Sequence, residues 1–276
     1  MENVSIAKLK IKKCSVGQMI DAEDELAVEE PLEIQLSNTN DTAAVAKNVA
    51  VTMRTPGFDE ELAIGFLFTE GIIRHKNQLA DNYYQQLTNN TILIKLNKNA
   101  QPSLNNAERN FYTTSSCGVC GKTSIESIKT VSVYKNLTDN IRLPAAMLYN
   151  LQNALVAQQA VFESTGGLHA AALFDLTGKF KTLREDVGRH NALDKVIGNA
   201  LLNEALPLDN CILLLSGRAS FELIQKASMA GIKIVVAIGA PSSLAVQLAE
   251  EMGMTLIGFL KKQRFNIYCG DERIDY

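Results

Sequence analysis

The strongest constraint on the fold is a regular alternation of apolar strands and helix-length segments in the second half of the chain. Short apolar runs, such as residues 211–215 and 232–238, are typical of strands buried on both faces. The pattern predicts strands at 169–174, 180–183, 211–215, 232–238 and 255–260, and helices at 191–202, 221–229 and 244–252. Strands that alternate with helices form layered α/β domains, so we expect such a domain with a largely parallel central sheet.

The first third of the chain predicts short strands. Leu32, Ile34 and Leu36 alternate with polar residues, and similar β character recurs at 49–53 and 92–96. Acidic residues at 59–61 suit the positive start of a helix, which Gly71 can end.

A polar stretch at 135–140 separates this region from the rest. Pro144 can occupy the first turn of the next helix, whose apolar face is expected at Leu148, Leu151, Leu155 and Val156. We therefore predict a smaller β-rich N-terminal domain over residues 1–140 and a larger layered domain over 141–276.

Composition excludes several classes of protein. The 276 residues are 46% hydrophobic, which is enough for a substantial core, and the net charge of −3 argues against binding to nucleic acid or an anionic membrane. The longest apolar runs fall short of the ~20 residues of a membrane-spanning helix, and the lysine-rich N-terminus does not resemble a signal peptide. The odd number of scattered cysteines predicts a reducing cytoplasm rather than a disulfide framework. They are Cys14, Cys117, Cys120, Cys211 and Cys269.

The pair Cys117-Gly-Val-Cys120, followed by Gly121 and Lys122, carries the most chemical information. Two thiols at this spacing serve redox exchange, metal ligation or sulfur handling. A structural zinc site needs four ligands, yet the other cysteines are isolated and the chain has only three histidines. A zinc deaminase is rejected because no glutamate stands two residues after His169.

A thioredoxin-like pair would leave a strand and enter a helix, whereas polar residues at 106–114 precede this one. The segment 115–122 therefore predicts a mobile, exposed loop, which suits a carrier whose thiolate reaches a donor and then an acceptor. Lys122 favours the reactive thiolate.

Several further segments are candidate binding sites, each with a plainer alternative. The turns 216–220 and 239–243 each offer free backbone N–H groups to an anion at the start of a predicted helix, and the first adds Ser216 and Arg218. Helix capping by Ser220 and Ser242 is the plainer explanation of their serines. His169 and His190 stand near predicted strand and helix starts, where packing or local ion pairs explain them equally well. The cations at 261–264 could meet a pyrophosphate with Phe259 against a base, or form a solvated charged turn.

An ordered series of motifs resembles the FdhD family, the accessory sulfurtransferases of formate dehydrogenase. It comprises 29–32, 61–67, 69–73, 117–121, 165–172, 185–195, 216–220 and 258–264. The resemblance implies a cytidine-deaminase-like larger domain, so that we expect an α/β (α+β overall) fold. It also implies a cytoplasmic homodimer that binds guanine nucleotide.

The same resemblance implies a sulfurtransferase that acts as a persulfide carrier. A cysteine desulfurase would load sulfur onto Cys117, and Cys120 would assist its transfer to the Mo-bis(molybdopterin guanine dinucleotide) cofactor, or its tungsten counterpart, before insertion into formate dehydrogenase. No permanently bound metal is expected. The alternatives are a chaperone that binds this cofactor with a structural cysteine pair, and a zinc-binding regulator. The predicted cofactor-binding residues are Phe259, Leu260, Lys261, Lys262, Gln263, Arg264, Ser216, Arg218, His169 and His190.

Overall fold

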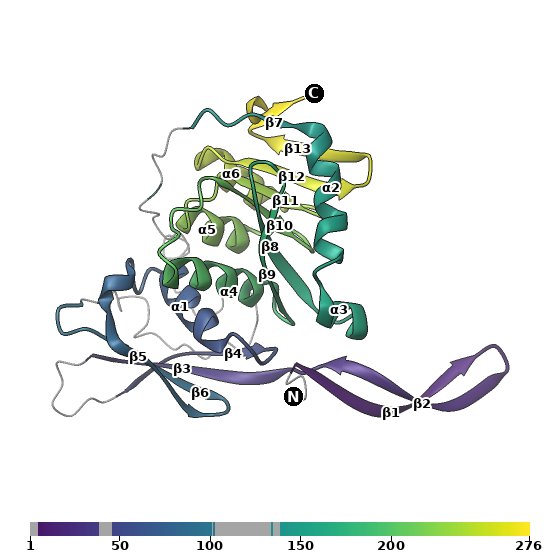
Figure 1. Cartoon of the computed structure of the whole chain (residues 1–276), viewed down its shortest axis with the longest axis horizontal. Coiled ribbons are helices and arrows are strands. Elements are labelled where there is room, and N and C mark those ends of the chain that lie inside the picture. Colours follow the sequence, from purple (N-terminus) through teal and green to yellow (C-terminus); the bar gives the residue numbers. More distant parts are fainter. Residues whose placement is uncertain (1–4, 39–45, 101, 103–133, 135–138) are drawn as a thin grey trace.

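The computed structural model describes residues 5–38, 46–100, 102, 134 and 139–276 (Figure 1). Cys117, Cys120 and the loop predicted around them lie outside the described residues.

A six-stranded sheet forms the centre of the C-terminal part, in the order β13-β12-β11-β10-β8-β9. Its strands are β8 (His169–Asp175), β9 (Phe180–Asp186), β10 (Cys211–Leu215), β11 (Ile234–Ala237), β12 (Thr255–Lys261) and β13 (Arg264–Cys269). The strands β10, β11 and β12 are parallel, whereas β8, β9 and β13 pair antiparallel to their neighbours. The expectation of a largely parallel sheet is therefore wrong. The β8–β9 and β12–β13 connections are too short for the crossover of a dozen or more residues that parallel neighbours need.

Helices cover both faces of this sheet, which confirms the layered α/β/α arrangement (Figure 1). On one face lie α4 (Arg189–Leu202), α5 (Phe221–Met229) and α6 (Ser243–Glu251). On the other lie α2 (Ala145–Val156) and the short α3 (Ala160–Thr165). Neighbouring residues of β10 point to opposite layers: Leu213 packs with the α4–α5 cluster, and Leu214 packs with Leu148 of α2.

A second sheet, with the order β4-β3-β6-β5, forms the N-terminal part. Its strands are β3 (Glu30–Asn38), β4 (Lys47–Arg54), β5 (Leu79–Thr88) and β6 (Thr91–Leu96). The predicted inward face of β3 is confirmed, because Leu32, Ile34 and Leu36 are buried. The helix α1 (Asp59–Thr69) lies between this sheet and α4 (Figure 1).

Four minor elements complete these parts. The 3-10 helix η1 (Lys76–Gln78) precedes β5. Near the C-terminus, β7 (Leu143–Pro144) pairs with β14 (Ile274–Asp275), which follows the 3-10 helix η3 (Asp271–Arg273).

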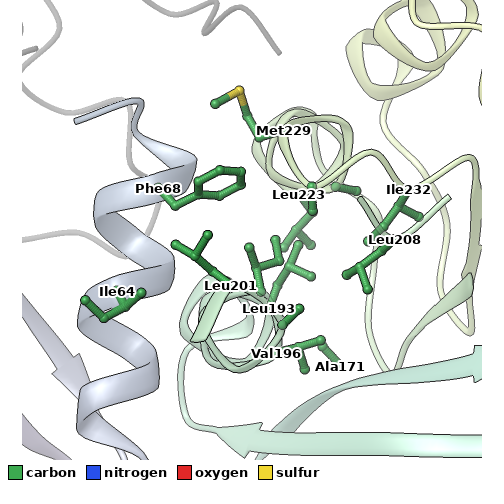
Figure 2. Close-up of a cluster of buried hydrophobic side chains, with 14 of the residues drawn as sticks. Ile64, Phe68, Ala171, Leu193, Val196, Leu201, Leu208, Leu223, Met229 and Ile232 are labelled. Atoms are coloured by element: carbon green, nitrogen blue, oxygen red, sulfur yellow. The ribbon is translucent and has the colours of Figure 1, made fainter. Parts of the chain in front are cut away.

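The two parts of the chain share one hydrophobic cluster. Figure 2 shows Ile64 and Phe68 of α1 beside α4, which contributes Leu193, Val196 and Leu201. Residues from both sides of position 140 therefore form a common core around α1 and α4.

A long hairpin of β1 (Ile6–Ser15) and β2 (Gln18–Ala27) extends away from the body of the protein (Figure 1). On one of its faces, lysines oppose acids: Lys8 pairs with Glu25 and Lys12 with Asp21. In the predicted second helix, Leu148, Leu151 and Leu155 are buried as expected, whereas Val156 is 60% exposed and is not part of the core face. Within the described ranges, helices are too short or too polar to span a bilayer.

Candidate functional site

Three of the predicted binding segments meet at one edge of the large sheet. They follow β10, β11 and β12, whose carboxyl ends lie together because these strands are parallel. The backbone N–H of Gly239 donates to the carbonyl oxygen of Gly217 at 2.9 Å, and that of Phe259 donates to the carbonyl oxygen of Gly239 at 3.0 Å. Ligands of open α/β sheets bind at this position, beyond the carboxyl ends of the strands.

Glycine permits this close approach of the three loops. A Cβ on Gly239 would lie 3.0 Å from the Gly217 carbonyl oxygen, and one on Gly258 would lie 2.8 Å from Cδ of Pro241. Larger side chains would therefore force the loops apart. Beyond Gly258, Phe259 has a φ of 52° and is 43% exposed, so its ring stands at the surface of this edge.

His169 and Ser216 come together at the same edge. His169 begins β8, which runs antiparallel to β10, and its Nδ1 would be 3.3 Å from a Cβ on Gly217. The Ser216 hydroxyl accepts a hydrogen bond from the N–H of Ala170 at 2.8 Å, which fixes the start of β8. Burial lowers the pKa of His169, and the neighbouring Arg189 and His190 lower it further, which favours the neutral imidazole.

The buried His190 and the half-buried Glu222 complete this region, and sequence reasoning missed Glu222. His190 lies in the first turn of α4 and Glu222 in the first turn of α5, with His190 Nε2 3.9 Å from a Glu222 carboxylate oxygen. The neighbouring imidazole lowers the pKa of Glu222 to about 2 despite the opposing effect of partial burial. We call His169, Arg189, His190, Ser220 and Glu222 the edge cluster. An acid in a helix's first turn is common, so the sequence around Glu222 did not single it out.

A separate cavity of about 830 Å³ lies between α2 and the β12–β13 turn, and we call it the turn pocket. It is lined by Gln152, Asn153, Val156, Ala157, Lys261, Lys262, Gln263 and Arg264. Three cations and no acid line it, so its charge suits an anionic ligand. Sequence analysis missed the α2 wall, because Gln152 and Asn153 resemble the ordinary polar face of a helix.

The predicted binding residues therefore divide between two neighbouring places. His169 and His190 belong to the edge cluster, with Ser216 beside them, and residues 261–264 line the turn pocket. Leu260 is fully buried among the residues that pack on α2, and it does not line the turn pocket. Arg218 is exposed, and its stem lies against Gly239.

The residues proposed to cap two helices behave differently. The Ser242 hydroxyl accepts from the N–H of Ala245, which is ordinary capping of α6. Ser220 makes no side-chain cap bond at the start of α5. Across the described ranges, His, Cys, Asp and Glu side chains nowhere gather in a group of three or more that could hold a metal ion.

Comparison with known proteins assigns the chain to a family. The model of the FdhD/NarQ family matches residues 27–275. The sulfur carrier protein FdhD of Mycolicibacterium paratuberculosis is 48% identical, over 97% of this chain and 98% of the relative. The protein of the same name from Streptomyces coelicolor is 45% identical, over 96% and 94%. A crystal structure of a candidate formate dehydrogenase accessory protein from Desulfotalea psychrophila has a similar fold, with a TM-score of 0.73, 24% identity and coverage of 98% of this chain and 99% of that one. The chain belongs to the FdhD/NarQ family.

Proposed function

We propose that this protein is a sulfur carrier for formate dehydrogenase. It takes sulfur from a cysteine desulfurase onto Cys117 and transfers it to the Mo-bis(molybdopterin guanine dinucleotide) cofactor before that cofactor enters the enzyme. The observation that carries the proposal is the cationic turn pocket, in a chain whose relatives are named sulfur carrier proteins. We further propose that the protein acts in the cytoplasm as a homodimer.

The turn pocket has the chemistry that a dinucleotide needs. Lys261, Lys262 and Arg264 offer positive charge to phosphate oxygens, and a guanidinium can hold two of them at once. Val156 and Ala157 supply an apolar surface for a base on the opposite wall. Phe259, exposed beside the turn, offers an aromatic face for stacking.

Sulfur loading is a thiolate exchange that needs no added oxidant. The Cys117 thiolate attacks the terminal sulfur of the desulfurase persulfide, a new S–S bond forms on Cys117, and the donor cysteine leaves as a thiolate. Covalent storage divides one difficult delivery into two easier steps. We assign Cys120 an assisting role, in which it resolves or relays the persulfide.

A second function, that of a cofactor-binding chaperone without sulfur chemistry, is favoured by one observation. The turn pocket is built from α2 and the β12–β13 turn alone and does not need a thiol to hold an anionic cofactor. In that case the cysteine pair would be structural.

Formate dehydrogenase maturation separates the two functions. Cell extract that lacks this protein is supplied with desulfurase, cysteine and either the natural protein or its Cys117→Ala variant, and formate oxidation is measured. A sulfur carrier predicts activation by the natural protein and loss of activation with Cys117→Ala. Equal activation by both proteins would contradict the carrier and support the chaperone. Cys14→Ala is the matched control, because Cys14 is an exposed free thiol on the hairpin.

A further inference from the structure

The β1–β2 hairpin has a charged face and an apolar face. On the charged face, lysines of β1 stand opposite acids of β2, in the pairs Lys8–Glu25, Lys10–Glu23 and Lys12–Asp21. The opposite side, which we call the open face, holds most of the large apolar side chains, because successive residues of a strand point to opposite sides. The open face consists of Ala7, Leu9, Ile11 and Lys13 on β1 and Ile20, Ala22, Asp24 and Leu26 on β2.

The open face is turned away from the body of the protein. Leu9, Ile20 and Leu26 are 50%, 57% and 41% exposed. The body meets the hairpin on its charged face instead, because a Cβ on Gly167, which follows α3, would lie 3.6 Å from Cβ of Ala27. Ala27 is two residues after Glu25 and therefore points to the same side of β2.

An apolar face on an extended hairpin needs a partner. A two-stranded hairpin by itself is only marginally stable in water, and exposed apolar patches mark surfaces at which proteins associate. The hairpin projects from the body (Figure 1), so its open face is accessible to another chain along its whole length.

The distribution of charge disfavours pairing of two hairpins through their edges. The lysines at positions 8, 10, 12 and 13 all belong to β1, and the acids at positions 21, 23, 24 and 25 all belong to β2. A β1 strand added to the β1 of another copy would place lysines beside lysines, and two β2 strands would place acids beside acids. Like charges on neighbouring strands are destabilising. Association of two copies is therefore favoured through the faces.

The two charges of the open face are arranged for such an association. Lys13 stands opposite Ile20, and Asp24 stands opposite Leu9, so that an apolar residue faces each charge across the hairpin. Lys13 lies two residues toward the turn from Ile11, whereas the Leu9–Asp24 pair lies two residues toward the base. The face therefore carries one charge of each sign, placed symmetrically about its midpoint at Ile11.

We propose that the open face binds the open face of a second copy, with the two hairpins antiparallel and related by a two-fold axis at Ile11. This interface rests on the proposed homodimer and names the surface that forms it. The axis brings the Lys13–Ile20 pair of each copy over the Leu9–Asp24 pair of the other, so both lysines reach an aspartate and the apolar side chains pack together. Each body lies on the outer, charged side of its own hairpin, so the two bodies do not compete for the interface.

Sedimentation equilibrium tests the interface with two neighbouring residues. Ile20→Glu places a carboxylate on the open face, and we expect the dimer dissociation constant to rise at least about 30-fold, as at an interface hot spot. Met19→Glu is the matched control, because Met19 is 68% exposed and points to the charged face. It should dimerise as the natural protein does. Equal dimerisation of the two variants, or a natural protein that stays monomeric, would overturn the proposal.

Exchange of the two charges tests the antiparallel arrangement. Lys13→Asp and Asp24→Lys each bring like charges together in a dimer of identical copies, and we expect each to dimerise about tenfold more weakly or worse. In an equimolar mixture, every lysine of a mixed dimer meets an aspartate, so the mixed dimer should form preferentially. Native mass spectrometry with one variant labelled with ¹⁵N identifies it. Mixed and identical dimers in statistical proportion would overturn the antiparallel arrangement.

Two further results separate this interface from other roles. A dimeric Ile20→Glu variant that no longer activates formate dehydrogenase would show that the open face binds a different protein, which overturns a second copy as its occupant. A natural protein that dimerises through the open face but gains no sulfur from desulfurase and cysteine would contradict the carrier function and leave the interface supported.

Discussion

Gly65 of α1 and Gly198 of α4 lie against each other where the N-terminal and C-terminal parts of the chain meet. A Cβ on Gly198 would stand 2.8 Å from the backbone nitrogen of Gly65 and 1.9 Å from the carbonyl oxygen of Glu61. A Cβ on Gly65 would stand 1.9 Å from the carbonyl oxygen of Asp194. The two helices therefore approach backbone to backbone, and this contact holds the α1 layer in place.

Alanine at either glycine is expected to destabilise the protein. Because the obstructing atoms belong to the backbone of the neighbouring helix, Gly65→Ala or Gly198→Ala should lower the free energy of unfolding by about 3 kcal/mol, at the upper end of the usual cost of overpacking. Urea denaturation measures the effect. Gly167→Ala is the control, since a Cβ there meets nothing closer than 3.6 Å. Losses below about 0.5 kcal/mol at both positions would show that the helices are not held so closely.

A buried ion pair between α4 and α5 should be equally sensitive. Lys226 Nζ lies 2.9 Å from an Asp194 carboxylate oxygen, and the two side chains are 9% and 2% exposed. Lys226→Met leaves Asp194 buried without its partner, and we expect a loss of about 3–5 kcal/mol in unfolding free energy. Lys8→Met breaks the exposed pair with Glu25 and should cost less than about 1 kcal/mol. Similar losses in the two variants, measured by urea denaturation, would contradict this difference.

Acid titration should reveal the pairing of Glu222 with His190. The folded-state pKa of Glu222 is about 2, below its ordinary value of 4.5, so folding favours the charged carboxylate. This contribution is fully present above pH 4.5 and is lost as the pH falls toward 2. The stability advantage of the natural protein over Glu222→Gln should therefore shrink over that interval. Thermal unfolding at several pH values measures the advantage, and a difference that stays constant from pH 6 to 2 would exclude the pairing.

Nucleotide binding should depend on the charge of the turn pocket. The triple variant Lys261→Ala, Lys262→Ala, Arg264→Ala removes three cations from the cavity wall, and we expect at least a tenfold weaker affinity for guanosine diphosphate, about 1.4 kcal/mol. Calorimetry measures this affinity. A control with the same change of charge replaces Lys8, Lys10 and Lys13 of the hairpin, which extends away from the body (Figure 1). Equal affinity of both triple variants would place the nucleotide elsewhere.

Much of the layered fold could be predicted from the sequence, because its elements carry their own local signals. The helix at 221–229 and the strand at 211–215 match the structure residue for residue. Strand direction could not be obtained this way, since the apolar runs of a buried strand look alike in parallel and antiparallel pairs. The β1–β2 hairpin was not predicted, because charged residues interrupt the apolar alternation of its strands. Its side chains also contribute little to the core.

The sequence predicts single segments of the candidate site but not how they come together. The motifs at 216–220 and 258–264 lie at one edge of the sheet, because loops after parallel strands meet there. The contact between His190 and Glu222 was not predictable, since it depends on how the starts of α4 and α5 face each other in three dimensions. The α2 wall of the turn pocket was missed for the same reason.

Intact mass measures most directly whether Cys117 carries sulfur. The natural protein, Cys117→Ala, Cys120→Ala and the Cys14→Ala control are incubated with desulfurase and cysteine, and their masses are compared before and after. Sulfur carriage on Cys117 predicts a gain of about 32 Da in the natural protein and in Cys14→Ala, located on Cys117 by peptide mapping, and no gain in Cys117→Ala. An equal gain in Cys117→Ala, or no gain in a natural protein that still activates formate dehydrogenase, would contradict it.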